Sequence, residues 1–112
     1  MMDGLLTHLA DRACREKAVV SSSFTQGMQL LAYPIDNGVL VAVGFGPERV
    51  RNVPVERVLR RRTEQPGRFG VWLPAAFADG SWYMVRRATR DTFGRLPLPS
   101  SDELASVQEL MT

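Results

Sequence analysis

The side chains that could do chemistry are few and widely spaced along the chain. His8 is the only histidine and Cys14 the only cysteine, and both fall on a segment that predicts a helix. With about 100° of rotation per helical residue, the two side chains lie on different faces and cannot pair as base and nucleophile. A metal site at His8 would need several more ligands. We therefore expect no metal site, a surface position for His8 and a small buried role for Cys14.

Two other segments come close to catalytic or phosphate-binding signatures without matching them. Ser21-Ser22-Ser23 lacks the glycines of a nucleophile elbow and predicts a loop. Gly44-Phe45-Gly46-Pro47 follows a predicted strand, but the third glycine of a dinucleotide turn is missing and Pro47 offers no amide. No two carboxylates are placed in one pocket by their spacing. The sequence therefore favours a binding protein over an enzyme, without a cofactor.

Arginine gives the clearest chemical pattern. Two blocks are basic, residues 48–68 with a net charge of +4 and residues 86–95 with a net charge of +3, whereas residues 96–112 carry −3. Arg57, Arg60 and Arg61 share a predicted helix in the first block. Such a face suits the carboxylates of an acidic protein or the phosphates of a nucleic acid, and it can also be merely solvated. The acidic C-terminal segment and the lack of a nucleic-acid-binding motif make nucleic acid the less favoured partner.

The spacing of apolar residues predicts an α+β fold, an antiparallel sheet of two hairpins with N-terminal, middle and C-terminal helices. Helices are expected at residues 4–18, at residues 54–64 and from Ser100 onward, where Ser100 and Glu103 form a capping box. Strands are expected at residues 24–35, 39–45, 68–77 and 81–88, and a short strand near Val50 and Val53 is left open. Tight turns are expected at residues 36–38 and 79–80. The length of 112 residues fits a single domain, residues 1–112.

The second predicted hairpin is rich in aromatic side chains. Trp82 and Tyr83 are neighbours on one strand and therefore point to opposite faces of the sheet, and Trp72 and Phe77 lie on the strand before it. Three short helices cannot easily cover both faces. Part of this surface is expected to be covered by another polypeptide, and core packing of at least one tryptophan is the alternative.

The order of predicted elements resembles that of the small chaperones of bacterial type III secretion, the class that binds effectors. The likeness is one of pattern and covers most of the chain in order. It lies in LLTHL (residues 5–9), MQLLA (residues 28–32), VLVAV (residues 39–43), WYMV (residues 82–85) and SDEL (residues 101–104). The resemblance implies a cytoplasmic homodimer that performs no chemistry and holds an extended segment of a secreted protein.

The binding mode that the resemblance implies is apolar burial in a groove, or strand addition at a sheet edge. Candidate groove or dimer residues are Leu30, Val41, Trp82 and Met84. The arginine face with Arg57, Arg60 and Arg61 suits an acidic protein partner, an effector or a subunit of the secretion apparatus. The alternative is a small arginine-rich nucleic-acid-binding or transcriptional regulatory protein.

The sequence also bears on location. No segment approaches the roughly 20 apolar residues that span a bilayer, and the first residues lack the pattern of a secretory signal. A single cysteine fits a reducing compartment. We expect a cytoplasmic protein that does not insert into membranes.

Overall fold

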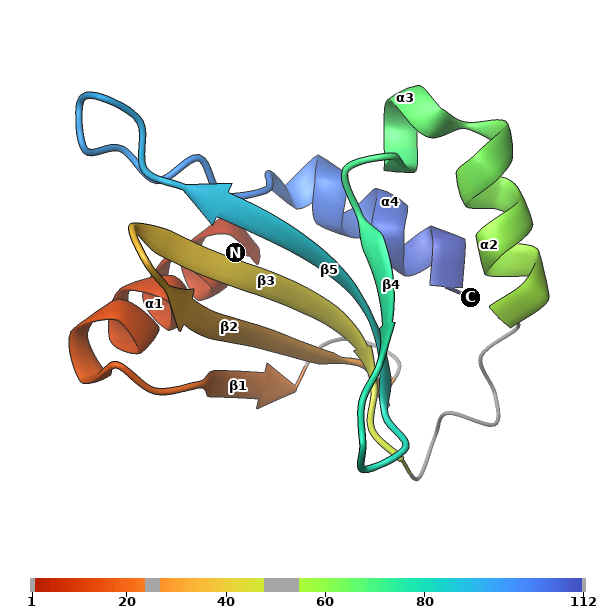
Figure 1. Cartoon of the computed structure of the whole chain (residues 1–112), viewed down its shortest axis with the longest axis horizontal. Coiled ribbons are helices and arrows are strands. Elements are labelled where there is room, and N and C mark those ends of the chain that lie inside the picture. The colour runs from red at the N-terminus through yellow and green to blue at the C-terminus, as the bar shows by residue number, and fades with distance from the viewer. Residues whose placement is uncertain (1, 24–26, 48–54, 112) are drawn as a thin grey trace.

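The computed structural model describes residues 2–23, 27–47 and 55–111 (Figure 1). The order of elements is α1 (Met2–Glu16), β1 (Val20–Ser23), β2 (Gln29–Ile35), β3 (Gly38–Phe45), α2 (Val55–Glu64), α3 (Pro66–Phe69), β4 (Leu73–Ala76), β5 (Trp82–Thr89) and α4 (Ser101–Met111). The predicted α+β class is confirmed: an antiparallel sheet carries N-terminal, middle and C-terminal helices.

The strands form one sheet in the order β1-β2-β3-β5-β4, and every neighbouring pair is antiparallel. The predicted turn between β2 and β3 is confirmed, and Asn37 adopts the left-handed φ of 60° that such a turn requires. The second hairpin turns at Gly80, with a φ of 90°. The two hairpins meet where β3 pairs with β5, so β3 lies at the centre of the sheet.

Helix α1 ends two residues earlier than predicted, and the cause is visible in its last turn. Lys17 has a φ of 53°, and the N–H of Ala18 donates to the carbonyl of Ala13 at 3.3 Å. This bond from the sixth residue back to the first is the Schellman arrangement, which closes a helix with a left-handed residue. The chain then turns directly into β1.

Two element predictions are corrected. Ser21, Ser22 and Ser23 belong to β1 rather than to a loop, because pairing with β2 overrides the low strand propensity of serine. The first part of the predicted strand 68–77 is wrong, since Pro66 opens the short helix α3 and β4 begins only at Leu73. Residues 24–26 of another predicted strand and the open possibility at Val50 and Val53 lie outside the described residues.

The helices gather on one side of the sheet. Helix α1 contacts β1, β2 and β3, α4 contacts β3 and α1, and α2 packs on α4 and α3 beside the β4 edge (Figure 1). The core lies between this side of the sheet and the helices. The helices contribute Leu6, Leu9, Ala10, Ala13, Val58, Phe69, Leu104, Val107, Leu110 and Met111 to it.

Candidate functional site

The strand register places the four apolar residues predicted to bind a partner on one face of the sheet, and this face is buried. Leu30 pairs with Val43, which pairs with Met84, and Val41 and Trp82 share their face of the sheet. Leu30, Val41 and Met84 are fully buried and Trp82 is 8% exposed. The expectation that these four form a groove or dimer surface is wrong in this structure, because α1 and α4 cover the face to which they all point. Any partner surface must lie elsewhere.

The arginines of α2 divide into two groups. Arg57 and Arg60 are exposed. Arg61 is half-buried and donates from Nη1 to the carbonyl of Glu109 at 3.4 Å, and Arg62 donates from Nε to the carbonyl of Trp72 at 2.6 Å. Arginine is suited to this role because its planar donors can satisfy several carbonyls at once. Part of the predicted arginine face therefore fastens α2 to the rest of the protein.

A partly buried polar cluster holds the ring of Trp72 in the core. The Trp72 ring is fully buried, and its Nε1 donates to Oε2 of Glu103 at 3.0 Å. Arg86 forms an ion pair with the same carboxylate oxygen. Glu103 thus ties α4 to β5 and to the segment before β4. Both indole rings are in the core, contrary to the expectation that part of the aromatic surface of the hairpin needs a partner.

We call the face of the sheet opposite to the one that α1 and α4 cover the open face. In the described part of the chain the helices lie on the face that carries Leu30, Val41 and Met84 or beside β4, and none lies over the open face (Figure 1). The register places one row of side chains across all five strands, Ser21, Leu31, Ala42, Val85 and Leu73. Neighbouring rows contain Tyr33, Leu40 and Arg87 on one side, and Gln29, Gly44, Tyr83 and Ala75 on the other.

Apolar side chains remain accessible across the open face. Tyr33 is 51% exposed and Leu73 59% exposed, and Leu31, Leu40 and Val85 between them are half-buried. Single exposed apolar residues are ordinary on protein surfaces. Here Tyr33 and Leu73 lie on either side of half-buried apolar side chains and of the buried Ala42, so accessible apolar surface is present on both sides of the central strand. The open face is therefore the candidate functional site.

Tyr83 is a buried residue at one end of the open face, opposite Gly44. Its ring lies over Gly44, where a Cβ would collide with the ring and with the backbone of Trp82. Its hydroxyl donates to Oε1 of Gln29 at 2.9 Å, and the Phe77 ring packs on it with 4.9 Å between centroids. Burial raises the pKa of the Tyr83 phenol from 10.0, and the charge of Asp79 adds to this rise while the bond from Ser81 opposes it. The phenol is therefore held neutral and in one orientation.

Asp79 stabilises the turn between β4 and β5. Its Oδ1 accepts the hydroxyl and the backbone N–H of Ser81. The side-chain bond from Ser81, followed by the backbone bond, lowers the pKa of Asp79 from 3.8. This arrangement is a side-chain-stabilised turn.

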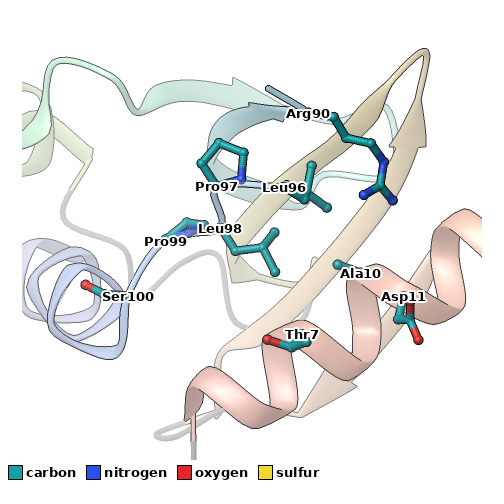
Figure 2. Close-up of a pocket in the computed structure, with 9 residues that line it drawn as sticks. All are labelled: Thr7, Ala10, Asp11, Arg90, Leu96, Pro97, Leu98, Pro99 and Ser100. Carbon is teal, nitrogen blue, oxygen red and sulfur yellow. The ribbon is translucent and has the colours of Figure 1, made fainter. Parts of the chain in front are cut away.

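A hollow of about 520 Å³ lies between α1 and the segment before α4. Figure 2 shows Arg90 and Leu98 extending toward α1 from the opposite wall, whereas the Asp11 carboxylate points away from that wall. The wall itself is Leu96-Pro97-Leu98-Pro99, which bends at Pro97, where the N–H of Leu98 donates to the carbonyl of Leu96 at 2.9 Å. A second hollow of about 510 Å³, which also includes Arg90, continues along α1 past Cys14 and Lys17.

These hollows do not assemble a reactive set. The polar residues of the first are Thr7, Asp11, Arg90 and Ser100, and Ser100 Oγ already accepts the N–H of Glu103 at 3.2 Å. Among the residues that the structure describes, no three His, Cys, Asp or Glu side chains come together as a metal site requires. His8 is exposed and Cys14 half-buried on α1. Over the same residues, no helix is both long and apolar enough to cross a bilayer.

The open face could have been found from the sequence in part. Alternation in β2 places Gln29, Leu31 and Tyr33 on one side, and β3 is apolar on both sides. A strand that is apolar on both faces is typical of one that is covered twice. The sequence does not show that the helices all pack on one face of the sheet. This one-sided packing leaves the other face accessible.

Comparison with known proteins adds no relative. No protein-family model matches the chain, and no curated protein or solved structure is similar enough to count as a match.

Proposed function

We propose that the protein is a non-catalytic, chaperone-like protein-binding module that holds an apolar segment of another protein on the open face. The observation that carries the proposal is the exposure of Tyr33 and Leu73, with the half-buried Leu31, Leu40 and Val85 between them, on a sheet whose other face is covered. Burial of such surface contributes roughly 25 cal/mol per Å², enough to drive association once a few large side chains are covered.

The β4 edge of the sheet offers less to a partner than the open face does. The N–H of Phe77 donates to the carbonyl of Ser81 at 2.9 Å, so the antiparallel ladder points Ala75 and Leu73 toward β5. The backbone groups of Pro74 and Ala76 then point outward, and Pro74 has no N–H to donate. A partner strand added along β4 would lose a ladder bond there. We therefore place the partner segment on the side chains of the open face rather than along β4.

The proposed identity of the partner rests on the resemblance described above. The observed elements follow the expected order of helix, hairpin, helix, hairpin and helix, with β1 and α3 in addition. This order supports a secreted effector or a secretion-apparatus subunit as the partner. A cytoplasmic location and a homodimer belong to the same proposal.

The alternative, a small nucleic-acid-binding or transcriptional regulatory protein, receives less support. Arg61, Arg62 and Arg68 contact carbonyls or side chains of the protein itself. Trp82 and Tyr83 are buried, so neither can stack on a base. Arg57 and Arg60 remain exposed on α2. If they bind phosphates, affinity for duplex DNA must fall steeply with salt, and no binding at low salt eliminates this function.

Site-specific photo-crosslinking tests the proposed function. A benzophenone amino acid replaces Tyr33 on the open face, and the control places it at His8, which is exposed on α1. In cells that make the protein, we expect the Tyr33 position to give a discrete adduct with a different polypeptide, reduced by a further Leu73→Asp change. The same adducts from both positions, an adduct only with a second copy, or no adduct contradicts the proposal.

A further inference from the structure

The turn after β5 presents a nearly bare aromatic ring. Phe93 is 84% exposed, more than any other large apolar side chain of the described residues. It lies in the loop that projects beyond the end of β5 (Figure 1). This loop is separate from the rows of the open face, which end with Arg87 and Thr89 on β5. We define the Phe93 turn as residues 90–95.

The Phe93 turn is held in shape by its own hydrogen bonds. Oδ1 of Asp91 accepts the N–H of Phe93 at 2.8 Å and that of Arg95 at 2.9 Å. The N–H of Asp91 donates to the carbonyl of Arg95 at 2.8 Å, and Gly94 adopts a φ of 80°. Arg90 donates from its N–H to the carbonyl of Asn37 at 2.8 Å and from Nη1 to that of Gly94 at 3.1 Å. A ring presented on an ordered turn loses little conformational entropy when it is bound.

The surroundings of the ring are basic. Residues 87–95 contain three arginines, Arg87, Arg90 and Arg95, and one acid, Asp91. All three arginines are exposed, and the Arg95 guanidinium carbon lies 5.9 Å from the centre of the Phe93 ring. Asp91 is committed to the turn through the two bonds that its Oδ1 accepts. Asp11 and Asp36 each line a hollow together with Arg90.

We propose that the Phe93 turn is a second docking site, which inserts the ring into an apolar pocket rimmed by carboxylates on an acidic protein partner. The ring supplies the anchor, and the arginines supply charge complementarity around it. Arginine is suited to this rim because it pairs with carboxylates through two parallel bonds. The site stands independently of the proposed function of the open face.

A protein partner fits these features better than a nucleic acid does. Strands of nucleic acid are held by several aromatic rings that stack on successive bases, and this turn offers one ring.

Peptide display tests the second site. The full chain is immobilised, a random 12-residue peptide library is selected on it, and the enriched peptides are then tested for binding to Phe93→Ala. Phe93 makes almost no core contact, so this variant keeps the fold, which a thermal melt verifies. Val71→Ala is the matched control, because Val71 is also exposed but lies beside Arg86 and Glu103.

We expect enriched peptides that combine Asp or Glu with a cluster of apolar residues. Their affinity falls at least about tenfold in Phe93→Ala and several-fold in Arg95→Glu, and is unchanged in Val71→Ala and in the open-face variant Leu73→Ser. Peptides that are lost in Leu73→Ser but kept in Phe93→Ala support the open face and overturn this site alone. No enrichment of acidic peptides overturns it as well. Phe93-dependent binding of single-stranded DNA or of phosphatidylglycerol vesicles in their place assigns the turn to another class of partner and overturns the proposal.

Discussion

At the scale of single residues, a few polar groups decide where the large side chains go. Glu103 accepts from the buried Trp72 ring and from Arg86, and Asp79 accepts twice from Ser81. The sequence predicts Glu103 as part of a capping box. Its backbone N–H does donate to Ser100 Oγ, while its carboxylate serves Trp72 and Arg86 instead. Sequence spacing identifies local partners of this kind and cannot identify partners that come from other elements.

Removal of the Glu103 carboxylate should destabilise the protein strongly. Glu103→Ala leaves the N–H of a fully buried indole and a half-buried guanidinium without their acceptor, which costs about 2–3 kcal/mol. Asp102→Ala, on the exposed side of the same helix turn, should cost less than about 1 kcal/mol. Urea unfolding of both variants measures the difference. Equal urea midpoints for Glu103→Ala and Asp102→Ala would show that the contacts of Glu103 with Trp72 and Arg86 do not stabilise the protein.

The stability should depend on acid through Asp79. Bonds from Ser81 lower the folded-state pKa of Asp79 from 3.8, so the carboxylate favours the folded state above that pH. The stabilisation is lost as the pH falls below 3.8 through the lowered folded-state pKa. Thermal melts between pH 7 and pH 2.5 should show a smaller acid-induced decrease in Asp79→Asn than in the wild type. Ser81→Ala, which removes the principal cause of the shift, should behave similarly, and three parallel curves would refute this role.

At the scale of elements, the patterns that repeat locally could be predicted and the pairings could not. The turn at Asn37 and the C-terminal helix follow from local signals. Strand β1 consists largely of serines and exists because β2 offers it a ladder. Helix α3 begins at Pro66, a residue that suits the first turn of a helix but is equally common where a preceding helix has ended, so local sequence does not decide between the two.

The edge strand β4 gives a prediction at this scale. Pro74 faces outward and leaves the edge without a donor at that position, which protects it from pairing with another chain. Pro74→Thr restores an N–H there and should increase self-association, because the outer edge of β4 then offers a donor to a strand of a second copy. Light scattering over a concentration series measures this. Pro97→Thr, in the exposed connector, is the control and should leave the particle size unchanged.

At the scale of the whole molecule, one sheet has a covered face and an open face. The sequence predicts that the hairpins carry more apolar surface than the helices can cover. The structure places Leu30, Val41, Trp82 and Met84 on the covered side and leaves Tyr33 and Leu73 on the other. The choice of side depends on where the connections carry α1 and α4, which no local pattern records. The surplus of apolar surface could be predicted, and its location could not.

Calorimetric titration with the partner captured at Tyr33 tests the central claim most directly. Leu73→Ser should weaken its binding at least about tenfold, because Leu73 is a large exposed anchor of the open face. Val71→Ser removes an apolar side chain of similar exposure that lies beside Arg86 and Glu103, and it should bind as the wild type does. Equal dissociation constants for wild type and Leu73→Ser would contradict the account.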